Sequence, residues 1–210
     1  MKAKCSIEIK KKLFDELYKA GLPRMFSKGD GKELSPLDIF VSGGVSVKPY
    51  VDIVLKFAPY LELDDKLWIA RVLSEKGLNI AVPFLLSLFQ EFDEKRDFWA
   101  VGNALTIIDD KSSYNKIIEI CREKKYGISR QMLIWILPKV KTKEAYEILI
   151  SCLDDHTVRG HAIDALGRFG DISAVPILES LVVKKGLYEY KAKNTALKRL
   201  YKISEKVSHP

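Results

Sequence analysis

The stretch DHTVRGHAIDALGRFGDISAVPILESL, residues 155–181, decides the fold class of this chain. Its first half places apolar residues on one helical stripe, with polar residues elsewhere: Val158, Ala162, Ala165, Leu166 and Phe169. Gly167 and Gly170 stand near the end of this helix, where a left-handed residue commonly closes it. Pro176 fits the first turn of a second helix, whose buried stripe is Val175, Leu178 and Leu181. The stretch therefore predicts two short amphipathic helices joined by a tight turn.

Asp155 precedes this helix pair and is placed to cap the first helix with its carboxylate. The small side chains of Ala162 and Ala165 would let the two helices approach closely. A two-helix unit of about 30 residues cannot bury both of its faces alone, so it needs neighbours.

The pattern D-x-x-V-R-x-x-A-x-x-A-L-G-x-x-G-D-x-x-A-V-P-x-L in this stretch resembles a HEAT repeat. It is similar above all to the short HEAT-like variety named after phycobilisome lyases. The resemblance implies an α-solenoid, in which Asp155 and Arg159 would belong to a ladder of polar residues between adjacent repeats.

The same pattern recurs along the chain. Residues 65–88 superpose on 158–181 without a gap, so that Gly77 meets Gly170 and Lys66 meets Arg159. Poorer copies pair 97–110 with 113–122 and 129–140 with 144–153, and the latter copy puts Arg130 at the Arg159 position. Residues 48–61 resemble a second helix with a degenerate partner, and 188–203 offer one more first helix. Equivalent positions 72, 104, 136, 165 and 196 are 32, 32, 29 and 31 apart.

These copies predict an all-α fold, a right-handed α-solenoid (superhelix) of about five HEAT-like helix pairs with a divergent N-terminal cap. Residues 1–46 form that cap, with a helix over 6–20 that points Ile9, Leu13, Leu17 and Phe14 inward, then a Gly-rich connection. Ser35 and Pro36 suit the N-cap and first position of a short helix there. The repeat array spans 47–205, residues 206–210 form a tail, and the whole is expected to be one continuous domain.

Composition narrows the class of protein. The chain has 210 residues, 47% of them hydrophobic, and three cysteines, Cys5, Cys121 and Cys152, without metal-ligand spacing. Reduced, buried thiols in a cytoplasmic protein are expected, and neither a membrane-spanning run nor a signal-peptide pattern occurs. The net charge of +7 is uneven, because residues 184–210 carry eight Lys or Arg against two acids.

Motifs of catalysis are weak. Residues 27–32 are Gly-rich and basic but lack the Walker spacing and a preceding strand, so they indicate a flexible loop. His156 and His161 would diverge on a helix, and His209 lies in the tail, so no metal site is expected. The paired aspartates join or precede helices, where capping explains them better than acid–base chemistry: Asp64-Asp65, Asp109-Asp110 and Asp154-Asp155. We therefore expect no enzyme activity, no metal and no cofactor.

Tryptophans Trp68, Trp99 and Trp135 occur once per repeat on first helices, off the stripe of the 155–181 unit. They either pack on a neighbouring repeat or under the N-terminal cap, or form an exposed aromatic patch that binds a partner.

Second helices are expected to line the concave face of the solenoid. Their non-core residues are the candidate contacts with a partner: Asp52, Lys56, Ser87, Glu119, Arg122, Ser151 and Glu179. Their mixed charges argue against a groove that tracks phosphates.

The sequence thus favours a non-catalytic module that binds a protein or peptide on its concave face. The alternative is a DNA-binding or DNA-repair protein resembling the DNA-alkylation-repeat glycosylases, although no matching Asp–aromatic cluster is apparent. Bilin attachment, as in phycobilisome lyases, is a third interpretation. The basic C-terminal segment either solubilises the last repeat or gives auxiliary binding to nucleic acid or an acidic partner: Lys191, Lys193, Lys198, Arg199, Lys202 and Lys206.

Overall fold

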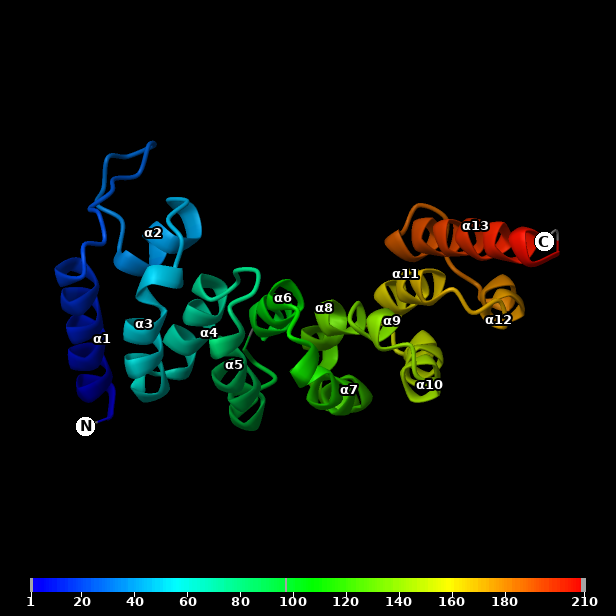
Figure 1. Cartoon of the computed structure of the whole chain (residues 1–210), viewed down its shortest axis with the longest axis horizontal. Helices are drawn as coiled ribbons and strands as arrows, with labels where there is room; N and C mark the ends of the chain where they lie inside the picture. Colours follow the sequence, from blue (N-terminus) through cyan, green and yellow to red (C-terminus); the bar gives the residue numbers. More distant parts are fainter. Residues whose placement is uncertain (1, 97, 209–210) are drawn as a thin grey trace. The chain divides into compact units, whose positions relative to one another are not determined.

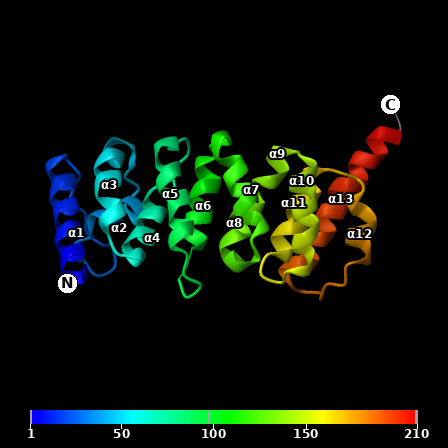
Figure 2. The ribbon, with the colours of Figure 1, turned by 90° about the horizontal axis from the view of Figure 1, so that it is seen from below.

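Helices make up the regular structure of the chain (Figure 1). The computed structural model describes residues 2–96 and 98–208, and side chains within 6–206 of that range. Two compact units divide the chain, Met1–Asp110 and Lys111–Pro210. Figure 2 shows that the helices of each unit follow one another in chain order. This is the stacked arrangement of an α-solenoid, and it confirms the predicted all-α class.

The first unit starts with α1 and continues as alternating first and second helices. Its helices are α1 (Lys2–Lys19), α2 (Pro36–Ser42), α3 (Val51–Phe57), α4 (Leu63–Val72), α5 (Val82–Leu88) and α6 (Trp99–Ile108). Helix α1 packs on α3, and α2, α4 and α6 pack on one another in that order. Leu13 and Leu17 of α1 are fully buried, while Ile9 and Phe14 are half-buried. Ser35 caps α2 through its hydroxyl, which accepts from the Asp38 amide, as the sequence predicts.

The second unit continues the alternation. Its helices are α7 (Tyr114–Arg122), α8 (Gln131–Ile134), α9 (Leu137–Val140), α10 (Lys143–Ser151), α11 (Arg159–Phe169), α12 (Ala174–Ser180) and α13 (Tyr188–Ser208). The single first helix expected over 129–140 is instead split into α8 and α9. Pro138 lacks an amide hydrogen, so it cannot continue the hydrogen-bond ladder of α8.

A left-handed residue stands at or shortly after the end of successive first helices: it is the C-cap of α6, α9 and α11 and follows α4 by five residues. Residues with positive φ stand at Gly77, Asp109, Lys141 and Gly170, which are 32, 32 and 29 apart. This spacing equals that of the apolar positions 72, 104, 136 and 165, five residues earlier in each copy. Gly44, with a φ of 71°, follows α2 in the same way. The series therefore extends to α2, inside the segment that the sequence assigns to the cap.

Close contact between α11 and α13 organises the end of the chain. A Cβ added at Gly167 would lie 2.6 Å from Ala196 Cα, and one at Gly160 would lie 2.5 Å from the Tyr188 ring. Gly170 is the left-handed C-cap of α11, as predicted, whereas Gly167 lies inside the helix and serves this close approach.

Asp155 does not cap α11, contrary to expectation. The helix begins at Arg159 after Val158, and no side chain caps that end. Asp155 instead closes the turn before it, because its Oδ1 accepts from the Thr157 amide at 3.0 Å and from the Thr157 hydroxyl at 2.6 Å.

None of the helices within residues 2–96 and 98–208 combines the length and apolar character that a bilayer crossing requires.

Candidate interaction surface

Arg130 is the most deeply buried charged residue of the second unit, with 1% of its surface exposed. It donates to the Cys121 carbonyl at 3.0 Å and pairs with the Asp155 carboxylate. Burial alone would raise the pKa of Asp155, but hydrogen bonds from Thr157 and Arg130 outweigh it and hold the pKa below its ordinary value. Arg159 points elsewhere and donates to the Leu153 carbonyl at 2.6 Å. The structure thus brings Arg130 and Asp155 together but leaves Arg159 out of that pair.

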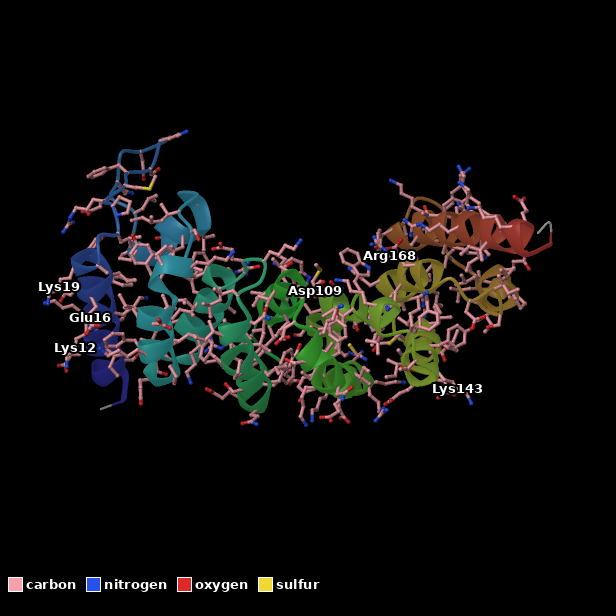
Figure 3. The ribbon with its side chains drawn as sticks, viewed as in Figure 1. Lys12, Glu16, Lys19, Asp109, Lys143 and Arg168 are labelled. Carbon is pink, nitrogen blue, oxygen red and sulfur yellow. The ribbon has the colours of Figure 1, made fainter. Side chains whose placement is uncertain are left out.

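The candidate second-helix residues lie at the surface, except that Ser87 is half-buried. Several of them already bind neighbouring helices. Lys56 pairs with Glu16 of α1 at 3.0 Å (Glu16 is labelled in Figure 3). Arg122 of α7 pairs with Glu144 of α10, and Glu179 of α12 accepts from the Tyr201 hydroxyl of α13. Ser87 and Ser151 donate to carbonyls of their own helices, at 2.7 and 2.8 Å.

A cleft of about 340 Å³ opens where α7 ends. Its lining combines both signs of charge with an aromatic ring and an apolar side chain: Glu119, Ile120, Arg122, Glu123, Lys125 and Tyr126. Glu119 and Arg122 are both candidates from the sequence. The cleft therefore gathers charged side chains and Tyr126 next to Ile120, which is itself largely buried.

The three tryptophans have different surroundings. Trp68 of α4 is 37% exposed and borders a cleft of about 440 Å³ between α1, α2 and α4. Trp99 at the start of α6 is half-buried. Trp135 is also half-buried, and its indole Nε1 is buried without a hydrogen-bond partner.

Trp135 begins a row of aromatic rings that crosses three first helices. Its ring centroid lies 5.4 Å from that of His161 on α11, and the His161 centroid lies 5.4 Å from that of Tyr188 on α13. Burial lowers the pKa of His161 below its ordinary value, and Asp164 opposes this only in part. Burial thus favours the neutral imidazole of His161, which lies between the rings of Trp135 and Tyr188.

A buried carboxylate joins this row to two arginines. Asp164 Oδ2 accepts from Arg168 Nε at 2.8 Å, and its Oδ1 accepts from Arg199 Nη1 at 2.8 Å. The Arg168 guanidinium also lies 5.4 Å from the centroid of the Trp135 ring. Arg168 is labelled in Figure 3. One carboxylate, two guanidinium groups and three aromatic rings are therefore linked by contacts within the second unit.

A comparison with known protein families finds a match to these helix pairs. Residues 114–197 match the family model described as HEAT repeats. Neither the search of curated proteins nor the search of solved structures found a match. The HEAT match runs from α7 into α13 and so includes the α7 cleft, the Arg130–Asp155 pair and the aromatic row.

Cys121 and Cys152, both within the matched segment, are buried. Cys121 is fully buried and Cys152 is 2% exposed, and burial raises the pKa of each thiol. They are reduced cysteines that pack near Arg130. The Cys5 side chain, Asp97 and His209 lie outside the described residues. His156 is exposed, and the part of the chain that the structure describes holds no group of three His, Cys, Asp or Glu side chains arranged as metal ligands.

Sequence reasoning missed the cluster around Asp164. Asp164 was assigned no role, and Arg199 entered only as part of a basic tail. One signal was available, because Arg168 and Arg199 are 31 apart and so occupy equivalent positions in successive HEAT repeats. Predicting that Asp164 of α11 binds both arginines requires knowledge of how α13 packs on α11.

Proposed function

We propose that this chain is a non-catalytic interaction module whose HEAT repeats bind a protein partner through their second helices. The α7 cleft carries this proposal, because it combines both signs of charge with Tyr126 and Ile120. Protein interfaces favour this mixture of an aromatic anchor and a polar rim. The exposed pairs around it, such as Arg122 with Glu144, contribute little to stability, so the same side chains are available to a partner.

The test is capture of partners by the full chain and by a charge-swapped form, Glu119→Lys/Arg122→Glu, with proteins quantified by mass spectrometry. We expect a specific partner to be lost with the swapped form. A matched control is Lys143→Glu/Glu147→Lys, which swaps an exposed i,i+4 pair on α10 at 3.5 Å. Retention of every captured protein by the swapped form would contradict binding at the α7 cleft.

A DNA-binding function is the second candidate, and one observation favours it. Asp164 accepts from Arg168, and Arg168 lies against the Trp135 ring, so one arginine connects an acid to an aromatic ring. Both carboxylate oxygens of Asp164 already accept from arginines, which disfavours a role for Asp164 as a base. Retention on duplex DNA at low salt and release of a damaged base would support this candidate, and no retention would remove it.

A further inference from the structure

A cationic cleft of about 480 Å³ lies between the end of α11 and the C-terminal half of α13. Four basic side chains line it together with one glycine and one isoleucine: Arg168, Arg199, Lys202, Lys206, Gly167 and Ile203. No acidic residue lines it, because Asp164 lies beneath the two arginines with only 12% of its side chain exposed. The cleft therefore keeps a positive charge after Asp164 is counted.

Asp164 fixes the position of both arginines. Each guanidinium uses one N–H on Asp164, at 2.8 Å in both cases, and keeps further N–H donors for a second acid. The arginine side chains remain 51% and 41% exposed, so those donors can reach a ligand. A guanidinium that is already held in place loses less entropy when it binds a carboxylate.

The two lysines add cations that no acid neutralises. Within the described residues, neither Lys202 nor Lys206 forms a side-chain hydrogen bond or an ion pair, and both are exposed. They stand one helical turn apart on the face of α13 that borders the cleft. Like charges this close repel one another, and an anionic ligand would relieve that repulsion.

We propose that this cleft binds an acidic segment of a protein partner, in which Asp or Glu residues alternate with apolar ones. The proposal rests on the proposed function and names the chemistry of the partner. Ile203, 36% exposed, gives the cleft an apolar wall. A groove of about 570 Å³ on α13 adds Leu197 and Tyr201, and Lys202 borders both hollows.

The same surroundings disfavour a nucleic acid in this cleft. Glu205 lines the adjoining groove, and Glu179 stands beside Tyr201. These acids interrupt the continuous basic track that a phosphate backbone needs. An acidic peptide of limited length places its carboxylates on the four cations and its apolar side chains on Ile203 and Leu197.

The experiment uses the full chain and a fluorescein-labelled synthetic peptide of alternating Asp, Glu, Leu and Phe, with binding followed by anisotropy. We expect Lys202→Glu/Lys206→Glu to weaken binding roughly tenfold or more, since two attractive contacts become repulsive. The matched control is Lys184→Glu/Lys191→Glu, which changes the net charge equally at exposed positions outside the cleft. The control should retain most of the affinity.

Trp135 supplies an independent readout because it lies against Arg168. Peptide binding should shift its emission, and the shift should vanish in Trp135→Phe while anisotropy still reports binding. Absence of peptide binding, or equal weakening by both lysine pairs, would overturn the proposal. Tighter binding of an oligonucleotide at the same salt, or occupation of the cleft by a second copy of the chain, would also overturn it. The α7-cleft swap leaves these residues intact, so the two proposals fail separately.

Discussion

Each unit contains an ion pair between a base and an acid 25 residues later, here called a polar rung. The two rungs have very different surroundings. Lys66 in the first unit pairs with Glu91 at 2.8 Å, and Arg130 in the second pairs with Asp155, in both cases 25 residues further along the chain. The acid is 45% exposed in the first rung and 11% exposed in the second. Arg130 also donates to the Cys121 carbonyl, whereas Lys66 donates to the Glu91 carboxylate. One register thus gives an ion pair with a half-exposed acid in one unit and a buried, multiply bonded ion pair in the other.

The same register shows why the rung is missing elsewhere. The position 25 residues after Arg159 holds Lys184, so two bases would meet there. Glu123 stands 25 residues after Phe98, which offers no charge. The rung therefore needs a base at the first position and an acid 25 residues later. The sequence of the first helix alone does not reveal both.

Arg130→Met tests the difference between the rungs and should have the largest effect. It leaves Asp155 and the Cys121 carbonyl without their partner in a buried region, so we expect a loss of about 3 kcal/mol in unfolding free energy. Lys66→Met leaves Glu91 half in solvent and should cost about 1 kcal/mol or less. Urea unfolding followed by circular dichroism measures both, and equal losses would show that burial does not separate the two rungs.

Gly167→Ala should rank second, because it affects the close contact between α11 and α13. Its Cβ would lie 2.6 Å from Ala196 Cα, and both belong to packed helices that cannot move apart cheaply. We expect a net loss of about 2 kcal/mol, since overpacking outweighs the gain in helix propensity. Gly167→Ser should be at least as harmful in the same urea measurement, and a stabilised alanine variant would contradict a tight contact.

Gly77→Ala, in the first unit, acts through backbone conformation instead of space. No atom lies within 4 Å of the added Cβ, but the φ of 76° is unfavourable for alanine. The expected loss is about 1 kcal/mol. Gly77→Asn should recover part of that loss, because asparagine tolerates the left-handed region better. The same exchange at Gly167 should not recover stability. If asparagine behaves like alanine at Gly77, conformation is not the cause.

Much of the repeat was predictable because it depends on local chemistry. The apolar spacing, Gly77, Gly170 and the Ser35 cap follow from rules that act within one or two turns. The left-handed conformations of Asp109 and Lys141 were not predicted, since neither residue is a glycine. Lys141 gains a compensating contact, because its ammonium donates to the Phe169 carbonyl at the end of α11. Gly77 makes the related bond with its own backbone amide, to the Ile108 carbonyl at 3.4 Å.

The candidate site was harder to predict because it depends on contacts between helix pairs. The Arg199–Asp164 bond joins residues 35 apart, and the split of the 129–140 helix determines where Trp135 meets His161. Arg168 and Asp164 lie one turn apart on α11, the first helix that the 155–181 stretch predicts. That stretch contains no information on which residue of α13 would reach them.

Lowering the pH tests how much the charge of Asp155 contributes to the second rung. We expect it to change the unfolding free energy least. The folded pKa of Asp155 is below its ordinary value, so the carboxylate contributes stability above the unfolded pKa of about 4. That contribution is lost as pH falls through the folded pKa. The unfolding free energies of the unmodified chain and of Asp155→Asn should therefore differ most near neutral pH and converge in acid. Because Asp155 retains some exposure, the pH-dependent part should be smaller than the loss in Arg130→Met. A difference that stays constant from neutral to acid pH would show that the charge on Asp155 contributes nothing, and the rung would then act through its hydrogen bonds alone.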